Sequence, residues 1–205
     1  MSMIWADGDR ERSAGDESNK LTVETINNHV YFYADVDSDR VLALLGELRR
    51  LDATLRNEHA TRQLEGIAPL TPIWLHVQSG GGDLFAGFSA ADQLQTIATP
   101  VYSIVEGYCA SAATLISMAC KRRFIQPNAF VLIHQLSSCM GGKYEEFRDE
   151  MRVLDMAMRR MVMFYAARSR LTPRQAYMLL RHDSWFGAQD CLRIGLVDEI
   201  MENRR

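Results

Sequence analysis

Short apolar runs alternate with longer amphipathic segments along the first half of the chain. The apolar runs predict strands at 29–36, 73–77 and 100–105. Helical periodicity follows two of them, at 38–56 and 84–98. In the first helix, with Ser38 or Asp39 as the candidate cap, four leucines are expected near one face: Leu42, Leu45, Leu48 and Leu55. The polar stretch 57–72, which contains two prolines and a glycine, predicts a loop.

The same alternation continues through the second half. A helix is expected at 106–120, then strands at 123–126 and 129–133. The longest helical signal, 143–170, carries an apolar seam at Phe147, Met151, Leu154, Met158, Met161 and Tyr165. Such a seam needs a partner, either the domain's own core or another helix. A helix at 172–182 follows, with Thr172 as its cap and Pro173 at its first position. The chain closes with a strand, a helix and a strand at 183–186, 188–195 and 196–200.

Strands that alternate with helices throughout predict an α/β domain with largely parallel strand pairing. We expect this domain at residues 29–205. Residues 1–28 begin with a polar stretch rich in Gly, Ser, Asp and Arg, which predicts an N-terminal arm, either mobile or axial.

Composition narrows the classes of function. The net charge is −3 and no basic stripe is interleaved with aromatic residues, so a nucleic-acid partner is not expected. No apolar run approaches the length of about eighteen residues that a membrane span needs. The four cysteines lie far apart, which favours reduced thiols in the cytoplasm. Neither cysteines nor histidines show metal-ligand spacing, so no metal and no cofactor is expected.

Three residue types could together form a serine hydrolase. Ser111 lies among alanines near the start of an apolar helix, where free N–H groups and the helix dipole favour negative charge. His134 ends the apolar run FVLIH, where a base would be held rigidly. Each has a plainer explanation, since Ser111 could simply start a helix and His134 could be a structural histidine. The orienting carboxylate stays open among Asp183, Asp190 and Asp198, because spacing does not choose between them.

A glycine run, SGGGD at 79–83, could place a backbone N–H opposite Ser111. Glycine runs after strands also bind phosphates, but no P-loop lysine follows and there is no G-x-G-x-x-G motif. Cys109 is not expected to be a nucleophile, because helical geometry would point it away from Ser111.

Four ordered blocks of sequence resemble the Clp protease proteolytic subunit, ClpP. They are VQSGGGDLFAG, EGYCASAATL, QPNAFVLIHQ and HDSWFGAQDCLRIGLVDEI, and the resemblance runs from about Val30 to the C-terminus. It implies that Ser111 is the nucleophile, His134 the general base and Asp183 the orienting carboxylate. It also implies oxyanion N–H groups from Gly82 and Ala112. Substrate would lie as a strand between two segments made of Gly81, Gly82, Asp83 and Leu84, and of Leu136, Ser137 and Ser138.

The resemblance further implies an architecture and partners. The fold would be a ClpP/crotonase-like spiral of β-β-α turns with the long helix as a handle. Two stacked heptameric rings would enclose a chamber in which unfolded polypeptides are cleaved, fed by a Clp-type AAA+ unfoldase. Three positions depart from the family pattern: Gly80 and Leu136 replace prolines, and Ala112 replaces a methionine. These changes keep the backbone donors but are expected to alter the pocket.

Three alternatives remain at this point. A crotonase-type CoA enzyme shares the fold but does not need a serine, histidine and aspartate together. A relative of signal-peptide peptidases would use a lysine base and normally a membrane anchor. A non-catalytic or latent subunit of a mixed Clp-type ring is a third reading, which retention of all three residues disfavours.

Overall fold

A computed structural model of the chain describes residues 23–64, 70–139 and 141–202. Its described part contains eight strands and six helices. The strands are β1 (Val23–Ile26), β2 (His29–Phe32), β3 (Ile73–Ser79), β4 (Val101–Ala110), β5 (Arg122–Ile125), β6 (Phe130–Ile133), β7 (Ser184–Gly187) and β8 (Glu199–Ile200). The helices are α1 (Ser38–Leu64), α2 (Leu84–Leu94), α3 (Ala112–Ala119), α4 (Tyr144–Arg168), α5 (Pro173–Leu180) and α6 (Ala188–Ile194).

The strands form one sheet with the order β1-β2-β3-β4-β5-β8, and the pairs from β2 to β8 are parallel. β1 and β2 form an antiparallel hairpin, and β7 pairs antiparallel with β6. The long strand β4 serves two neighbours, because its first half pairs with β5 and its end pairs with β6. The prediction of an α/β domain with largely parallel pairing is confirmed.

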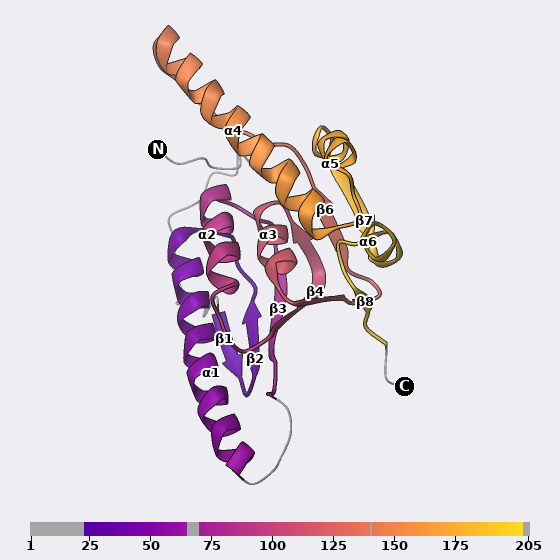
Figure 1. The fold of residues 1–205 in the computed structure, drawn as a ribbon. Helices are drawn as coiled ribbons and strands as arrows, with labels where there is room; N and C mark the ends of the chain where they lie inside the picture. Colours follow the sequence, from indigo (N-terminus) through magenta and orange to yellow (C-terminus); the bar gives the residue numbers. More distant parts are fainter. Residues whose placement is uncertain (1–22, 65–69, 140, 203–205) are drawn as a thin grey trace, which may run out of the picture.

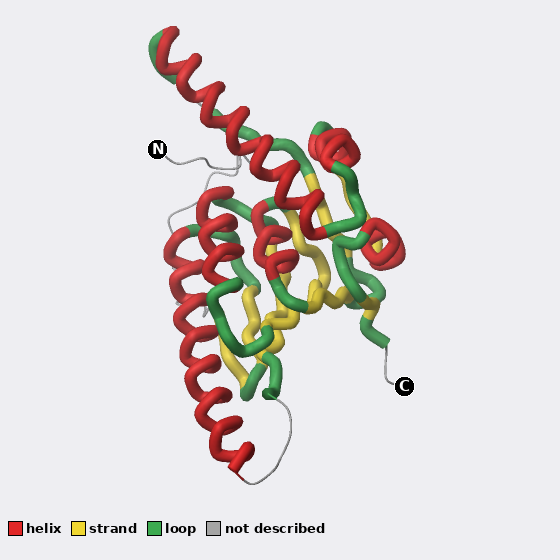
Figure 2. Tube along the Cα trace, viewed as in Figure 1, coloured by secondary structure: helices red, strands yellow, loops and turns green. Residues whose placement is uncertain are grey.

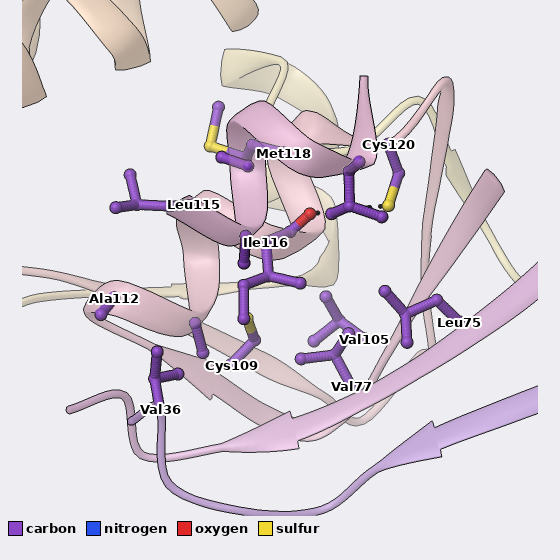
Figure 3. Close-up of a cluster of buried hydrophobic side chains, with 14 of the residues drawn as sticks. Val36, Leu75, Val77, Val105, Cys109, Ala112, Leu115, Ile116, Met118 and Cys120 are labelled. Atoms are coloured by element: carbon purple, nitrogen blue, oxygen red, sulfur yellow. Dashed lines mark hydrogen bonds between the residues drawn. The ribbon is translucent and has the colours of Figure 1, made fainter. Parts of the chain in front are cut away.

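Helices α1, α2 and α3 lie side by side over one face of the sheet (Figures 1 and 2). The core between them and the strands is apolar, and Figure 3 shows Leu115 and Ile116 of α3 above Leu75, Val77 and Val105 of the strands. Each of these side chains is fully or almost fully buried, which stabilises the fold by about 1.5–3 kcal/mol apiece. Since α3 is anchored so firmly, its first residue has a fixed position.

Helix α4 is half inside the domain and half outside it. Its C-terminal part buries Met161, Phe164 and Tyr165 against the core. Its N-terminal part extends away from the rest of the molecule (Figure 1). Tyr144 and Met151 in this part are exposed. The predicted seam therefore uses the domain's own core at one end and leaves apolar surface uncovered at the other. None of the described helices is both long and apolar enough to span a membrane.

Helix α1 differs from its prediction in length and register. It continues to Leu64, so the predicted loop is wrong for 57–64, and residues 65–69 lie outside the described part. The cap is Asp37, whose carboxylate accepts the Arg40 N–H at 2.8 Å. Leu42 is 71% exposed, because the buried face is made by Val41, Leu44, Leu48 and Leu51.

Two further elements differ at their boundaries. Strand β1 lies at 23–26, inside the segment assigned to the N-terminal arm, and residues 1–22 are outside the described part. The helix expected from residue 106 is wrong for 106–110, which continue β4. Pairing with Ser79 and with β6 keeps these residues extended, and Gly107 absorbs a local irregularity with a φ of 60°. Thr172 and Pro173 cap α5 as predicted.

Candidate active site

Ser111 occupies the turn between β4 and α3, with φ 57° and ψ −129°. A non-glycine residue with positive φ costs on the order of 1–3 kcal/mol and persists only where its surroundings impose it. The backbone of Ser111 is held on both sides. Its N–H donates to the carbonyl of Leu132 in β6 at 2.9 Å, and its own carbonyl accepts the Thr114 N–H at 2.9 Å. The fold thus stores strain at this one serine.

The Ser111 side chain is buried, with 2% of the residue exposed. In the part of the chain that the structure describes, Ser111 Oγ has no hydrogen-bond partner. A buried hydroxyl without a partner costs about 1–3 kcal/mol, so it calls for an explanation other than stability. Ala112 directly follows as the first residue of α3, and the first N–H of a helix has no acceptor within the helix.

The glycine run lies directly against this turn. An added Cβ at Gly81 would be 2.6 Å from Ser111 Cβ and 3.0 Å from Ser111 Oγ. The run is fixed to the segment after β2, because the Val36 N–H donates to Gly81 O at 2.8 Å and the Asp83 N–H donates to Val36 O at 2.7 Å. Gly82 has a φ of 147°, and an added Cβ there would be 2.3 Å from Val36 O.

Gly81, the first residue of the first predicted substrate-binding segment, therefore lies against Ser111. Asp83 uses its side chain to cap α2, since its Oδ1 accepts the Ala86 N–H at 2.7 Å, and Leu84 is buried. The main-chain groups of Gly81 and Asp83 are also hydrogen-bonded within the fold, so Gly82 is the position between them whose main chain has no recorded hydrogen bond among the described residues. In the second segment Leu136 packs on the core, and Ser138 Oγ donates to Glu150 Oε1 of α4 at 3.3 Å. Ser137 between them is exposed.

His134 follows the last residue of β6, and Asp183 precedes the first residue of β7. These two strands pair antiparallel with Ile133 opposite Ser184, which brings the two side chains together. His134 Nδ1 and Asp183 Oδ1 are 3.7 Å apart, longer than a hydrogen bond, and the Asp183 side chain is 74% exposed. Burial lowers the pKa of His134, and the charge of Asp183 acts in the opposite direction. The imidazole is therefore neutral at neutral pH, as a general base must be.

The other two candidate carboxylates have different partners. Asp198 forms an ion pair with Arg123 at 2.6 Å, and Asp190 forms one with Arg193 at 2.6 Å. Geometry thus favours Asp183, which spacing alone could not select. Cys109 lies in β4 and not in a helix, so the stated reason for setting it aside was wrong. It is nevertheless buried, which raises the pKa of its thiol and suits a packing role.

Sequence reasoning missed two residues that touch this turn. Thr114 Oγ1 donates to the carbonyl of Ser111, and Tyr165 of α4 contacts Thr114 Oγ1 through its hydroxyl. Tyr165 was noted only as a member of the apolar seam of α4. The available signal was its phenol, since a buried tyrosine hydroxyl usually finds a hydrogen-bond partner.

A second polar cluster lies on the sheet, away from the helices α1 to α3. His76 Nδ1 is 2.8 Å from Glu106 Oε1, and His29 Nδ1 is 2.9 Å from His76 Nε2. The Tyr33 hydroxyl donates to the other oxygen of Glu106. The hydrogen bond with His76 holds the pKa of Glu106 below its usual range. None of these residues was expected to form a site.

Ser111 lies on a strained strand-to-helix turn, which is also the local backbone arrangement that carries the nucleophile of α/β hydrolases. The fold and the turn together define an α/β protein with a serine on a strained strand-to-helix turn. The sequence model of the Clp protease family matches residues 26–204. The chain belongs to the Clp protease family.

Individual relatives agree with this membership. The ATP-dependent Clp protease proteolytic subunit 2 of Treponema denticola is 31% identical over 171 residues, which cover 81% of this chain and 84% of the relative. The protein of the same name from Bifidobacterium longum is 30% identical over 190 residues, covering 92% and 88%. A solved structure of a ClpP1 mutant from Listeria monocytogenes superposes with a TM-score of 0.72 at 23% identity, covering 87% of this chain and 93% of that one. The expected ClpP-like fold is confirmed.

Proposed function

We propose that this chain is the serine endopeptidase subunit of a Clp-type complex, with Ser111 as nucleophile, His134 as general base and Asp183 as orienting carboxylate. The observation that carries the proposal is the Ser111 turn itself. Its backbone is strained, and its hydroxyl is buried without a hydrogen-bond partner among the described residues. Both features destabilise the fold, and a catalytic function of the Ser111 hydroxyl explains why they are present.

The reaction would proceed by acyl transfer. Ser111 Oγ attacks the peptide carbonyl carbon while its proton passes to the imidazole of His134. The N–H groups of Ala112 and Gly82 stabilise the oxyanion, and the positive end of α3 adds to this. The C–N bond then breaks as His134 gives the proton to the leaving amine. Water, deprotonated by His134, hydrolyses the ester and regenerates Ser111, while Asp183 keeps the imidazole in the required tautomer.

Substrate would lie between the two predicted strand segments, Gly81 to Leu84 and Leu136 to Ser138. The first segment has its side chains engaged elsewhere or absent, and the main chain of Gly81 and Asp83 is hydrogen-bonded within the fold, so it would bind a peptide through the main chain at and after Gly82. Such binding is largely independent of substrate sequence. Selectivity would then come from control of entry into a chamber.

The projecting half of α4 supports assembly into the two stacked heptameric rings that we propose. It exposes large apolar side chains along several turns: Tyr144, Phe147, Met151, Val153 and Met156. Tyr144, Phe147 and Met151 follow helical spacing and therefore lie on one side of the helix, and exposed apolar residues grouped in this way are typical of an interface. The relatives are named ATP-dependent Clp protease proteolytic subunits, which supports a Clp-type AAA+ unfoldase as the partner. The cytoplasm is the proposed compartment, because all four cysteines are free thiols.

The test is covalent labelling of the purified protein with a fluorophosphonate, combined with native mass measurement. Labelling of a species of fourteen subunits is expected, together with cleavage of an unfolded protein once the unfoldase is added. Ser111→Ala should lose labelling and at least about 10³-fold of the peptidase rate while it keeps the native mass. Ser117→Ala, on the same helix but far from the turn, is the matched control and should still be labelled. A Ser111→Ala variant that still cleaves peptides would refute the proposal. A wild-type species of fourteen subunits that is not labelled would support the alternative of a latent subunit of a mixed ring.

A further inference from the structure

We infer that Tyr165 of α4 is a positioning residue for Ser111 and its oxyanion donor, acting through Thr114. The inference rests on the proposed function and adds to it a connection that runs from α4 to the reacting serine. Thr114 Oγ1 lies 2.5 Å from the carbonyl oxygen of Ser111, and the Tyr165 hydroxyl lies 2.5 Å from Thr114 Oγ1.

The direction of the two hydrogen bonds follows from the number of protons available. The carbonyl of Ser111 can only accept a hydrogen bond, so the Thr114 hydroxyl must donate its single proton to it. The Tyr165 hydroxyl must therefore be the donor to Thr114. The chain of donors runs from α4 inward and ends at the backbone of the nucleophile.

Both side chains are buried, with about the same 1% exposure for Thr114 and Tyr165. Burial also raises the pKa of the Tyr165 phenol, so it stays protonated and able to donate. Hydrogen bonds in a dry interior are electrostatically stronger than in water, and consecutive ones polarise each other. The link between α4 and the turn is thus shielded from competition by solvent.

The link matters because the carbonyl of Ser111 shares a peptide plane with the N–H of Ala112. That carbonyl and the N–H of Ala112 belong to the same planar, trans peptide unit, so fixing the direction of one fixes the other. Ala112 N–H is the proposed oxyanion donor. Thr114 and Tyr165 therefore set the angle at which this donor meets the developing negative charge, as well as the ψ angle of Ser111.

A purely structural explanation is that Tyr165 fills the core and its hydroxyl merely needs a partner. The same helix offers a pair with which to separate the two explanations. Ser103 of β4 and Ser117 of α3 are buried, with their hydroxyl oxygens 3.1 Å apart. This pair lies toward the other end of α3 and makes no contact with the Ser111 turn in any recorded hydrogen bond among the described residues.

The experiment compares Tyr165→Phe, Thr114→Val, the double variant and Thr114→Ser with Ser117→Ala as control. Each is assembled as the full chain, checked by native mass, and assayed for kcat and KM on a short peptide. Misplacement of a catalytic group by a remote change costs up to about 10²-fold. We expect Tyr165→Phe and Thr114→Val each to lower kcat by roughly 10- to 100-fold with KM nearly unchanged.

Three comparisons decide the outcome. The double variant should be no slower than Thr114→Val, because Tyr165 acts only through Thr114. Thr114→Ser, which keeps the hydroxyl, should retain most of the rate, and Ser117→Ala should keep kcat despite a similar loss of stability. Wild-type kcat in Tyr165→Phe, or additive losses in the double variant, would overturn the inference. If Tyr165→Phe does not assemble, Thr114→Val against Thr114→Ser gives the same decision.

Amide hydrogen exchange supplies a readout that does not need activity. Tyr165→Phe should speed exchange in a peptide covering the start of α3, including Ala112, and Ser117→Ala should not. If the wild-type protein is not labelled by a fluorophosphonate, the proposed function fails. Amide exchange in Tyr165→Phe then still shows whether Tyr165 holds the turn. If exchange at the start of α3 is the same as in wild type, the role of the Tyr165–Thr114 hydrogen bond in holding the turn is rejected as well.

Discussion

Gly81→Ala offers a sharp test of the geometry around Ser111. An added methyl group at Gly81 would lie 2.6 Å from Ser111 Cβ and 2.7 Å from the carbonyl oxygen of Ala110. Neither neighbour is the end of a flexible side chain, so the backbone itself must move. Gly81 also has a φ of 92°, a conformation that alanine adopts only with strain.

The size of the effect follows from these two contributions. The left-handed backbone costs alanine about 1–2 kcal/mol. Overpacking against rigid neighbours costs a further ~1–3 kcal/mol. Together they predict a loss of about 2–5 kcal/mol in the free energy of unfolding, which lowers the midpoint of thermal unfolding by roughly 4–20 °C for a chain of this length. The moved atoms include Ser111 Cβ, so the rate of fluorophosphonate labelling should fall about 10²-fold.

The matched control is Gly46→Ala on α1. Gly46 is exposed and an added Cβ there meets nothing within 4 Å. Because alanine is the better helix former, this variant should gain about 0.5–1 kcal/mol and keep the wild-type labelling rate. A Gly81→Ala protein with wild-type stability and wild-type labelling would show that the glycine run does not lie against Ser111, and the proposed site would be wrong.

Two predictions concern pH. The peptidase rate should fall on acidification with a midpoint below the ordinary histidine pKa of 6.5, because burial lowers the pKa of His134 and only the neutral imidazole is a base. Asp183→Asn should move the midpoint lower still, since Asp183 raises that pKa, and a midpoint above 6.5 would contradict this account. The pKa of Glu106 is lower in the folded protein than its unfolded value of about 4.5. The ionised carboxylate therefore stabilises the fold above pH 4.5, and this stabilisation is lost as the pH falls through the pKa of the folded protein. Urea unfolding should therefore show wild type losing more stability than Glu106→Gln between neutral pH and about pH 4, and equal losses would count against the His76 contact as the cause.

Much of this protein could be read from local patterns. Apolar periodicity located β3, β5, β6 and most helices, and the pair Thr172 and Pro173 marked the start of α5 correctly. These features are local, since a helix or strand face is buried or exposed over neighbouring residues and a cap needs only its own turn. Ser111 and His134 were candidates for a similar local reason. Ser111 stands at the start of an apolar helical pattern, and His134 stands at the end of an apolar strand pattern.

Other features depend on neighbours that are distant in sequence. Residues 106–110 continue β4 because partners in β3 and β6 complete their hydrogen bonds, which overrides the local preference. Asp183 reaches His134 only through the antiparallel pairing of β6 with β7. Gly81 meets Ser111 across 30 positions, and Tyr165 meets Thr114 across 51. Periodicity along the chain reports which face is buried, whereas these contacts are set by which buried faces pack together, and only the tertiary structure decides that.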